Sequence, residues 1–515
     1  MSLQEVKHFH VCGGIGSGAA GFNDADPSIP GMAGKMVCIG GVDVDARACA
    51  DFRSLTGVKQ AQLDLFTLGM YQAFHGRMPP AGWSEAAPDD FRVAAHHQFP
   101  DIVFTSMPCK GFSGLLSATK SVTAKYVALN ELTLRGVWLT MEAFADNPPG
   151  LFVFENVPRI TSRGRPLLDQ IGAILRHFGY AIAETTHDCG ELGDGLAQSR
   201  RRFLLVARHM AKVQPFLYEP PKRPLRAVGE ILSHMPLPGD PAGGPMHRVP
   251  SLNWKTWVRL AFVEAGSDWR SINKLAVEDG KLRDFLIVPD MHRGTIGVKA
   301  WDQPVGTITG NARSVTGAFS VADMRFDQSS KWNDGQAYGV RRWDQSIGTI
   351  AGQQGPGQGS YSVADPRCAE TKHNNGRWSV QDPRVCEMVQ VGKFGKLPEA
   401  NDKLVCRIQA LDGTWHRPFT TLELAALQSI IDPEEWFAPG APGACGEHFV
   451  MDGASDQRWR DGIGNAVPRK AAKAIGEVMG RTILLARNGE TFQLGSTPIW
   501  VRPLVAAITV SQVLP

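Results

Sequence analysis

Short apolar runs alternate with amphipathic stretches over the first two hundred residues of the chain. The apolar runs are rich in β-branched and aromatic residues and are bounded by Gly, Pro and Asp, which is typical of buried strands. They predict strands at 8–12, 36–42, 61–65, 101–106, 151–155, 181–187 and 202–207. Apolar residues at helical spacing predict helices over 126–145 and 166–178. This alternation indicates an α/β fold with a doubly wound, Rossmann-like parallel sheet.

The pattern changes after residue 208, where proline-rich sequence is followed by short strand-like runs rich in Gly and Trp. "WDQPVGTITG" from Trp301 recurs as "WDQSIGTIAG" from Trp343, and this offset of 42 residues indicates a duplicated unit. Helical spacing returns at 420–431 and 468–480. We therefore predict the first part of an α/β domain at 1–208, a β-rich domain at 209–416, a return to the first domain at 417–480 and a C-terminal extension at 481–515.

Glycines and acids follow the first three predicted strands. "VCGGIGSG" places Gly14 and Gly16 in a turn between a strand and a helix, where the backbone can approach a ligand closely. The second strand ends at Asp43, which could accept hydrogen bonds from ribose hydroxyls, and the third at Asp64, placed to meet an adenine amino group. Three such strand ends predict a nucleoside cofactor, although the glycine turn alone fits a nicotinamide site equally well.

The fourth and fifth predicted strands lead to a thiol and a carboxyl group. "DIVFTSMPCKGFSG" carries Cys109 into a glycine-containing loop, and "LFVFENV" ends its strand at Glu155. These strands are neighbours in a doubly wound sheet, so both groups should meet at its carboxyl edge. A thiol can add to an electron-poor ring while an acid donates a hydrogen bond to a ring nitrogen. A small buried thiol packed beneath a loop is the structural alternative.

A basic run begins at "QSRRRF", where Arg200 and Arg202 alternate outward from one face of a strand edge. There they could orient a carboxylate or bind a phosphate. The net charge of the chain is only +3, so any surface for nucleic acid must be local.

The ordered set "CGGIGSG", "MPCKGFSG", "FENV", "QSRRRF", "RPFTTLELAALQ" and "GIGNAVP" resembles the DNA cytosine-5 methyltransferases over roughly 1–208 and 417–480. The resemblance implies an S-adenosylmethionine-dependent methyltransferase sheet with a target-recognition domain at 209–416. It also implies methylation at C5 of a cytosine flipped out of duplex DNA, through a covalent bond from Cys109 to C6. Glu155 would hold the N3 proton and the 4-amino group, Arg200 would assist the attack, and Arg202 would position the loop.

The resemblance also implies which residues bind the cofactor and the DNA. The cofactor pocket would be lined by Cys12, Gly14, Ile15, Gly16, Asp43, Val44, Asp64, Leu65, Pro108, Asn465 and Val467. The DNA would meet Lys110, Gly111, Phe112, Ser113 and Gln198, and we add Gln353 and Gln354 because glutamine can read adenine edges. His10-Val11-Cys12 stands where the family usually has Asp-Leu-Phe, so this chain lacks the phenylalanine that stacks near the adenine.

Three other functions stay open from the sequence: an RNA cytosine methyltransferase on the same scaffold, a DNA-binding regulator without catalysis, and a nicotinamide dehydrogenase. The expected partner is double-stranded DNA, bound by a monomer in the cytoplasm, as in prokaryotic or phage-type restriction–modification. No apolar run reaches the length of a membrane span, and the polar start does not resemble a signal peptide. Nine cysteines without a CxxC pair indicate a reducing compartment and no zinc site.

Overall fold

The computed structural model describes residues 2–108, 124–214, 217–263, 265, 296–299, 317–321, 340–342, 344–347, 362–364, 398–405, 408–409, 415–490 and 499–501. The chain divides into two compact units. One unit comprises Met1–Met235, Ser346–Gln354 and Thr421–Pro515, and the other comprises Pro236–Gln345 and Gly355–Thr420.

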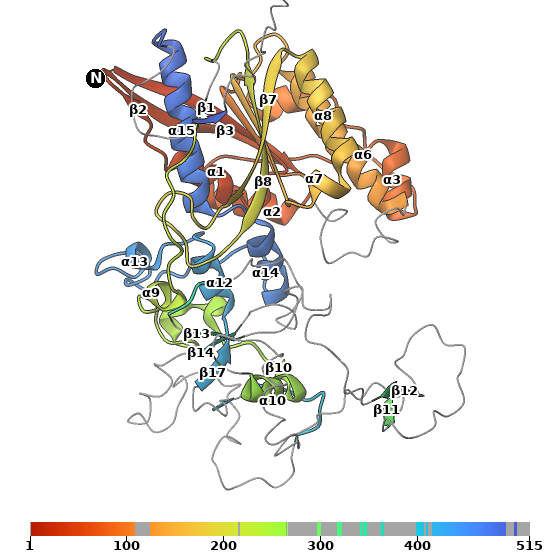
Figure 1. Ribbon diagram of the computed structural model, residues 1–515, viewed down its shortest axis with the longest axis vertical. Coiled ribbons are helices and arrows are strands. Elements are labelled where there is room, and N and C mark those ends of the chain that lie inside the picture. Colours follow the sequence, from red (N-terminus) through yellow and green to blue (C-terminus); the bar gives the residue numbers. More distant parts are fainter. Residues whose placement is uncertain are drawn as a thin grey trace, which may run out of the picture. The chain divides into compact units, whose positions relative to one another are not determined.

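A mixed sheet forms the centre of the first unit (Figure 1). Its strands lie in the order β2 (Ser28–Ile29), β3 (Met32–Asp43), β1 (Ser2–Val11), β5 (Ile102–Thr105), β6 (Leu151–Asn156), β8 (Arg201–His209) and β7 (Tyr180–Asp188), and β4 (Ala61–Gln62) pairs with β3. The pairs β1–β3, β1–β5 and β5–β6 are parallel, whereas β8 is antiparallel to both β6 and β7. The α/β prediction is confirmed, but the expectation of a wholly parallel sheet is wrong. The described link 189–200 between β7 and β8 contains no helix, and a parallel crossover normally needs one.

Side chains of the central strands alternate between two hydrophobic cores. Val103 and Phe152 belong to one core, and Ile102 and Val153 belong to the other. The first core is covered by α3 (Leu68–His75), α4 (Pro88–Ala94), α6 (Ala124–Ala143) and α8 (Arg165–His177), and the second by α1 (Ser17–Asn23) and α15 (Arg469–Arg487). Helices therefore cover both faces of the sheet (Figure 1), as continuous apolar strands require.

The remaining described elements of the first unit are short. They are α2 (Ala46–Thr56), α7 (Ile160–Arg163), β9 (Leu217–Tyr218), α9 (Val228–Leu232), α12 (Thr421–Leu427), α13 (Pro433–Trp436), α14 (Asp456–Asn465) and β18 (Ile499–Val501), which pairs with β9. The helices expected at 126–145, 166–178, 420–431 and 468–480 correspond to α6, α8, α12 and α15.

The second unit contains a small core around α10 (Trp254–Phe262). Trp257 is fully buried, and its indole N–H donates to the Leu404 carbonyl oxygen at 2.9 Å. The other described elements are η1 (Pro241–Gly243), η2 (Pro245–His247), β10 (Leu252–Asn253), β11 (Ile296–Lys299), β12 (Gly317–Val321), β13 (Val340–Arg342), β14 (Ser362–Ala364), β15 (Lys403–Leu404), β16 (Ile408–Gln409) and β17 (Trp415–Pro418).

The two copies of the sequence repeat form the same kind of strand pair. In the first copy β11 and β12 are parallel, with Val298 opposite Ser320. In the second copy β13 and β14 are parallel, with Val340 opposite Ser362. Both partners are displaced by the 42-residue offset of the repeat. The described part of this region thus builds β structure twice from one sequence pattern.

We expect Gly21→Ala to destabilise the first unit. A Cβ at Gly21 would lie 2.2 Å from the Arg469 carbonyl oxygen and 2.8 Å from the Ala472 Cβ, so α1 and α15 would have to separate. The cost should be roughly 2 kcal/mol, although alanine has the higher helix propensity. Gly18 in the same helix is the matched control, because its Cβ would be an ordinary 3.6 Å from the Val467 Cβ. Urea unfolding measures both variants, and equal stabilities would contradict the prediction.

Candidate active site

The carboxyl edge of the sheet brings an acid and an arginine together. Because β8 is antiparallel to β6, its first residues lie beside the last residues of β6, with Glu155 opposite Leu204. Side chains two residues apart on a strand share a face, so Arg202 lies diagonally across from Glu155. The antiparallel direction of β8 therefore places the "QSRRRF" arginines at the edge where the parallel strands end.

Two donors hold the Glu155 carboxylate. Arg202 Nε lies 2.8 Å from Oε1, and Ser106 Oγ donates to Oε2 at 2.9 Å. The Glu155 and Arg202 side chains are only 9% and 11% exposed. A carboxylate this buried needs such partners, and here they come from both neighbouring strands. Ser106 was not foreseen from the sequence, although its position directly after β5, next to the end of β6, is a usable signal.

The loop predicted to carry the nucleophile lies outside the described residues. The described chain reaches Pro108, which is half-buried, and stops one residue before Cys109. Cys109, Lys110, Gly111, Phe112 and Ser113 are outside the described residues, as are Gln353 and Gln354. Their roles stay predictions.

Arg200 differs from its expected orientation. It precedes β8, is 2% exposed, and donates from Nη1 to the Gly464 carbonyl oxygen at 3.1 Å. Its backbone N–H donates to Asp188 Oδ1 at 2.6 Å. The prediction that Arg200 points outward beside Arg202 is wrong, because a buried guanidinium needs an acceptor and the C-terminal return supplies one.

Gln198 is fully buried in this structure, and its contact with DNA stays a prediction. Gln198 is buried because the residues on either side of it pair with Ile347. Ile347 donates its N–H to the Ala197 carbonyl oxygen at 2.6 Å and accepts the Ser199 N–H at 2.7 Å. Ile347 is 2% exposed and closes over this segment as an isolated parallel bridge.

The glycine-rich turn is shaped for close approach to a ligand. Gly14 and Gly16 have φ values of +54° and +88°, a left-handed conformation that favours glycine. The Gly14 N–H donates to Asp43 Oδ2 at 2.9 Å, while Asp43 Oδ1 accepts the Asp45 N–H at 3.0 Å. A Cβ at Gly14 would meet nothing within 4 Å, so the turn is open on that side. Asp43 thus ties this turn to the end of β3 and keeps oxygen lone pairs for further donors.

Cys12 and His10 lie directly before the glycine-rich turn. Cys12 has a φ of +52°, its Sγ lies 3.4 Å from Met107 Sδ, and burial raises the pKa of its thiol well above the ordinary value. His10 Nε2 lies 2.9 Å from His8 Nδ1. Burial lowers the pKa of His8 to about 3 and that of His10 well below its usual value. A neutral histidine pair therefore stands here.

Asp64 is half-buried and holds two donors from its own chain. Oδ1 accepts the Phe66 N–H at 3.0 Å, and Oδ2 accepts the indole N–H of Trp83 at 3.0 Å. Trp83 lies between the strands predicted at 61–65 and 101–106, in a stretch for which we predict no element, so no pattern pointed to it. Of the other predicted cofactor residues nearby, Leu65 is 4% exposed and Val44 is 59% exposed.

The C-terminal return packs against the glycine-rich turn. Ser17 Oγ donates to the Val467 carbonyl oxygen at 2.8 Å. A Cβ at Gly462 would lie 3.0 Å from Ile15 Cγ2, which shows how closely α14 approaches the turn. Ile15 and Val467 are buried, whereas Asn465 at the end of α14 is exposed. Residues distant in sequence thus complete one wall of the predicted cofactor region.

Asp51 on α2, the helix that follows Asp43 in the chain, contacts the C-terminal return. Oδ1 accepts the Asp452 N–H at 2.6 Å, and Arg458 Nη2 lies 3.4 Å from Oδ2. Asp51 is 3% exposed, and burial raises its pKa to about 6. A carboxyl whose pKa is raised by folding stabilises the fold when protonated, and this contribution is lost as pH rises through the folded pKa.

We therefore expect the stability of the wild-type protein to fall relative to Asp51→Asn as pH rises. Between about pH 5 and pH 7.5 the wild type should lose roughly 1 kcal/mol that the variant does not lose. All other titratable groups are common to both proteins, so their effects cancel in the difference between the two free energies of unfolding. Urea unfolding at the two pH values measures it, and a difference that does not change with pH would contradict the assignment.

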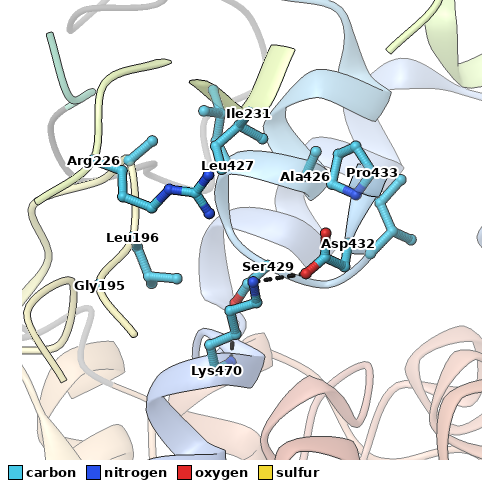
Figure 2. A pocket seen from close by; sticks show the side chains of 12 residues that line it. Gly195, Leu196, Arg226, Ile231, Ala426, Leu427, Ser429, Asp432, Pro433 and Lys470 are labelled. Atoms are coloured by element: carbon cyan, nitrogen blue, oxygen red, sulfur yellow. Dashed lines mark hydrogen bonds and ion pairs between the residues drawn. The ribbon is translucent and has the colours of Figure 1, made fainter. Parts of the chain in front are cut away.

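A separate small cavity lies beside the start of α15 (Figure 2). Its volume is about 10 Å³, enough for about one water molecule. Lys470 Nζ lies 2.7 Å from Asp432 Oδ2, and Arg226 Nη2 lies 2.9 Å from Glu434 Oε1, so both cations are paired. None of the predicted cofactor residues lines this cavity.

Within the described part of the chain, no three His, Cys, Asp or Glu residues are grouped closely enough to hold a metal ion. None of the described helices is long and apolar enough to cross a membrane.

A Rossmann-like sheet with a glycine-rich turn, acids at successive strand ends and a buried carboxylate–arginine pair defines an α/β enzyme built around a nucleoside cofactor. The family model of the C-5 cytosine-specific DNA methylases matches residues 12–481, and the chain belongs to this family. It is thus a methyltransferase that uses S-adenosylmethionine to methylate cytosine at C5 in nucleic acid. The resemblance drawn from the sequence motifs is confirmed.

No curated protein matches the chain. Solved structures similar to it include the Entamoeba histolytica methyltransferase EhMeth, with 11% identity and a TM-score of 0.42, covering 92% of this chain and 98% of that chain. A mutant of Spodoptera frugiperda DNMT2 has 11% identity and a TM-score of 0.44, covering 92% and 99%. The S. pombe Dnmt2 methyltransferase has 12% identity and a TM-score of 0.37, covering 94% and 99%.

Proposed function

We propose that the chain methylates C5 of cytosine in double-stranded DNA through a covalent bond between Cys109 and C6 of the base. The observation that carries the proposal is the Glu155 carboxylate, which Arg202 and Ser106 hold from the two neighbouring strands. Ser106 lies three residues before Cys109 in the sequence. An acid fixed at the start of the loop that bears a thiol suits attack on a ring whose nitrogen must be protonated.

The proposed steps use this arrangement as follows. The Cys109 thiolate bonds to C6, and the ring electrons move to N3, where Glu155 holds the proton. C5 thereby becomes a nucleophile and bonds to the donated methyl group, the sulfonium sulfur would leave with the electron pair of the broken S–C bond, and N3 returns its proton to Glu155. S-adenosylmethionine, when bound, supplies an electrophilic methyl group on a sulfonium sulfur. Loss of the C5 proton to water then restores the C5–C6 double bond and expels the thiolate.

Arg202 and Arg200 support these steps differently. Arg202 orients the Glu155 carboxylate through Nε, and its Nη1 donates to the Arg201 carbonyl oxygen at 2.9 Å, so Nη2 would face the base or the loop. Arg200 reaches the Gly464 carbonyl oxygen and so ties the edge of β8 to the C-terminal return. In this proposal Arg200 assists the attack by fixing the wall of the pocket.

The residues at the glycine-rich turn fit S-adenosylmethionine chemically. The open side of Gly14 admits the ligand, Asp43 offers acceptors for ribose hydroxyls, and Asp64 offers acceptors for the adenine amino group. The proposed pocket further includes Cys12, Ile15, Gly16, Val44, Leu65, Pro108, Asn465 and Val467.

We propose that the second unit selects the DNA sequence and that the target cytosine leaves the duplex, which costs a few kcal/mol. Lys110, Gly111, Phe112 and Ser113 would follow the flipped nucleotide, and Gln353 and Gln354 would read base edges. The size of the second unit favours duplex DNA over RNA as the substrate, because recognition of a DNA sequence needs protein surface beyond the catalytic sheet. The enzyme would act as a monomer.

Transfer of tritiated methyl groups to duplex DNA and to tRNA tests the substrate. We expect incorporation into duplex DNA, and bisulfite sequencing of DNA from expressing cells should then show a methylated sequence. Incorporation into tRNA alone would overturn the DNA proposal in favour of an RNA enzyme. Duplex DNA that contains 5-fluorocytosine should form a covalent adduct, since C5 cannot lose fluorine as it loses a proton.

A further inference from the structure

The segment between α3 and α4 is anchored over the end of β4. Glu85 Oε1 accepts the Leu68 N–H at 2.7 Å at the start of α3. From α6, Arg135 Nη2 donates to the Ala86 carbonyl oxygen at 2.7 Å. Both anchors lie within three residues after Trp83 in the chain, and the Trp83 ring centroid lies 5.4 Å from that of Tyr71. Trp83 is thus held in place independently of Asp64.

The contact from Trp83 fixes how Asp64 presents its oxygens. An ionised carboxylate has about four lone-pair positions. The Phe66 N–H takes one on Oδ1 and the Trp83 indole N–H takes one on Oδ2, both at 3.0 Å. Donors from two separate segments therefore set the plane of the group, and one acceptor position on each oxygen remains. Because hydrogen bonds to an ionised group are strong and directional, the remaining positions have a defined direction.

We propose that Trp83 is a positioning residue for the cofactor, which holds Asp64 so that its remaining lone pairs meet the 6-amino group of adenine. The inference rests on the proposed role of Asp64 in the cofactor pocket. A carboxylate fixed in this way accepts hydrogen bonds from a 6-amino group and repels a 6-oxo group. Trp83 therefore contributes to selection of the adenine ring, and not only to packing.

Calorimetric titration with S-adenosylhomocysteine and its 6-oxo analogue S-inosylhomocysteine tests this role on the full chain. The variant is Trp83→Phe, which keeps an aromatic ring and removes the N–H. We expect the preference for the adenosyl ligand to fall about fivefold or more, mainly through weaker adenosyl binding. Trp138→Phe is the matched control, because Trp138 lies on α6 and is 40% exposed, and it should leave both affinities unchanged.

The outcomes separate this inference from the proposed function. Wild-type protein that binds the two ligands equally would overturn the role of Asp64 itself. A wild-type preference that survives intact in Trp83→Phe would overturn the inference about Trp83 alone, and so would an equal loss of affinity for both ligands. If Trp83→Phe fails to fold, the indole N–H resonance of Trp83 in the wild-type protein decides. It should shift on addition of S-adenosylhomocysteine and shift less with the 6-oxo analogue, and an unchanged resonance would reject the inference.

Discussion

Replacement of Cys109 by serine should abolish methyl transfer and the covalent adduct with DNA that contains 5-fluorocytosine. A thiol with an ordinary pKa of ~8.5 supplies some thiolate at neutral pH, whereas a serine hydroxyl stays protonated and attacks C6 far more weakly. We expect a loss of roughly 10⁴-fold or more in kcat, as for other enzymes that lose their nucleophile. Transfer of tritiated methyl groups and a denaturing gel of the trapped adduct measure the two effects.

The exposed free thiol of Cys445 provides the control. Cys445→Ser makes the same chemical change outside the proposed active site, so its transfer rate and adduct yield should match those of the wild type. S-adenosylhomocysteine binding by Cys109→Ser should also be normal. If the adduct forms with Cys109→Ser but not with Cys445→Ser, the nucleophile is Cys445 and the proposal for Cys109 is wrong.

Glu155→Gln should lower kcat by about 10³-fold while cofactor binding is retained. Glutamine has nearly the same shape and can still accept the hydrogen bond from Ser106 Oγ, but it cannot carry the N3 proton as a carboxyl does. The substitution also leaves Arg202 without its ion pair, and a buried unpaired charge costs about 3 kcal/mol or more of stability.

A second variant separates these two consequences. Arg202→Met in the Glu155→Gln background removes the unpaired charge, so urea unfolding should show recovery of most of the lost stability. Methyl transfer should remain low in the double variant, because the acid is still absent. Recovery of activity together with stability would show that Glu155 acts only in folding.

The sequence predicted those parts of the site that depend on where single strands end. Asp43 ends β3, Glu155 lies at the end of β6, and β5 and β6 pair in parallel as expected. Apolar alternation is a local property, so it can be read without knowledge of the partners. Cys109, which the same reasoning placed after β5, stays a prediction.

The remaining features depend on contacts between segments far apart in sequence. The outward orientation expected for Arg200 failed because its partner, Gly464, is 264 residues away. Trp83 reaches Asp64 from a stretch with no regular pattern, and its role follows only from the folded arrangement. The antiparallel course of β8 could be inferred only once the link before it was seen to lack a helix.

The bridge at Ile347 limits how the second unit could be exchanged between relatives. In sequence Ile347 lies within the second repeat copy, but in space it belongs to the first unit and pairs with the residues just before Arg200. A chimera that replaced everything from Pro236 to Thr420 would also replace this buried partner of the arginine segment. A working graft must therefore retain residues 346–347 of the recipient, or supply an apolar residue on extended backbone at that point.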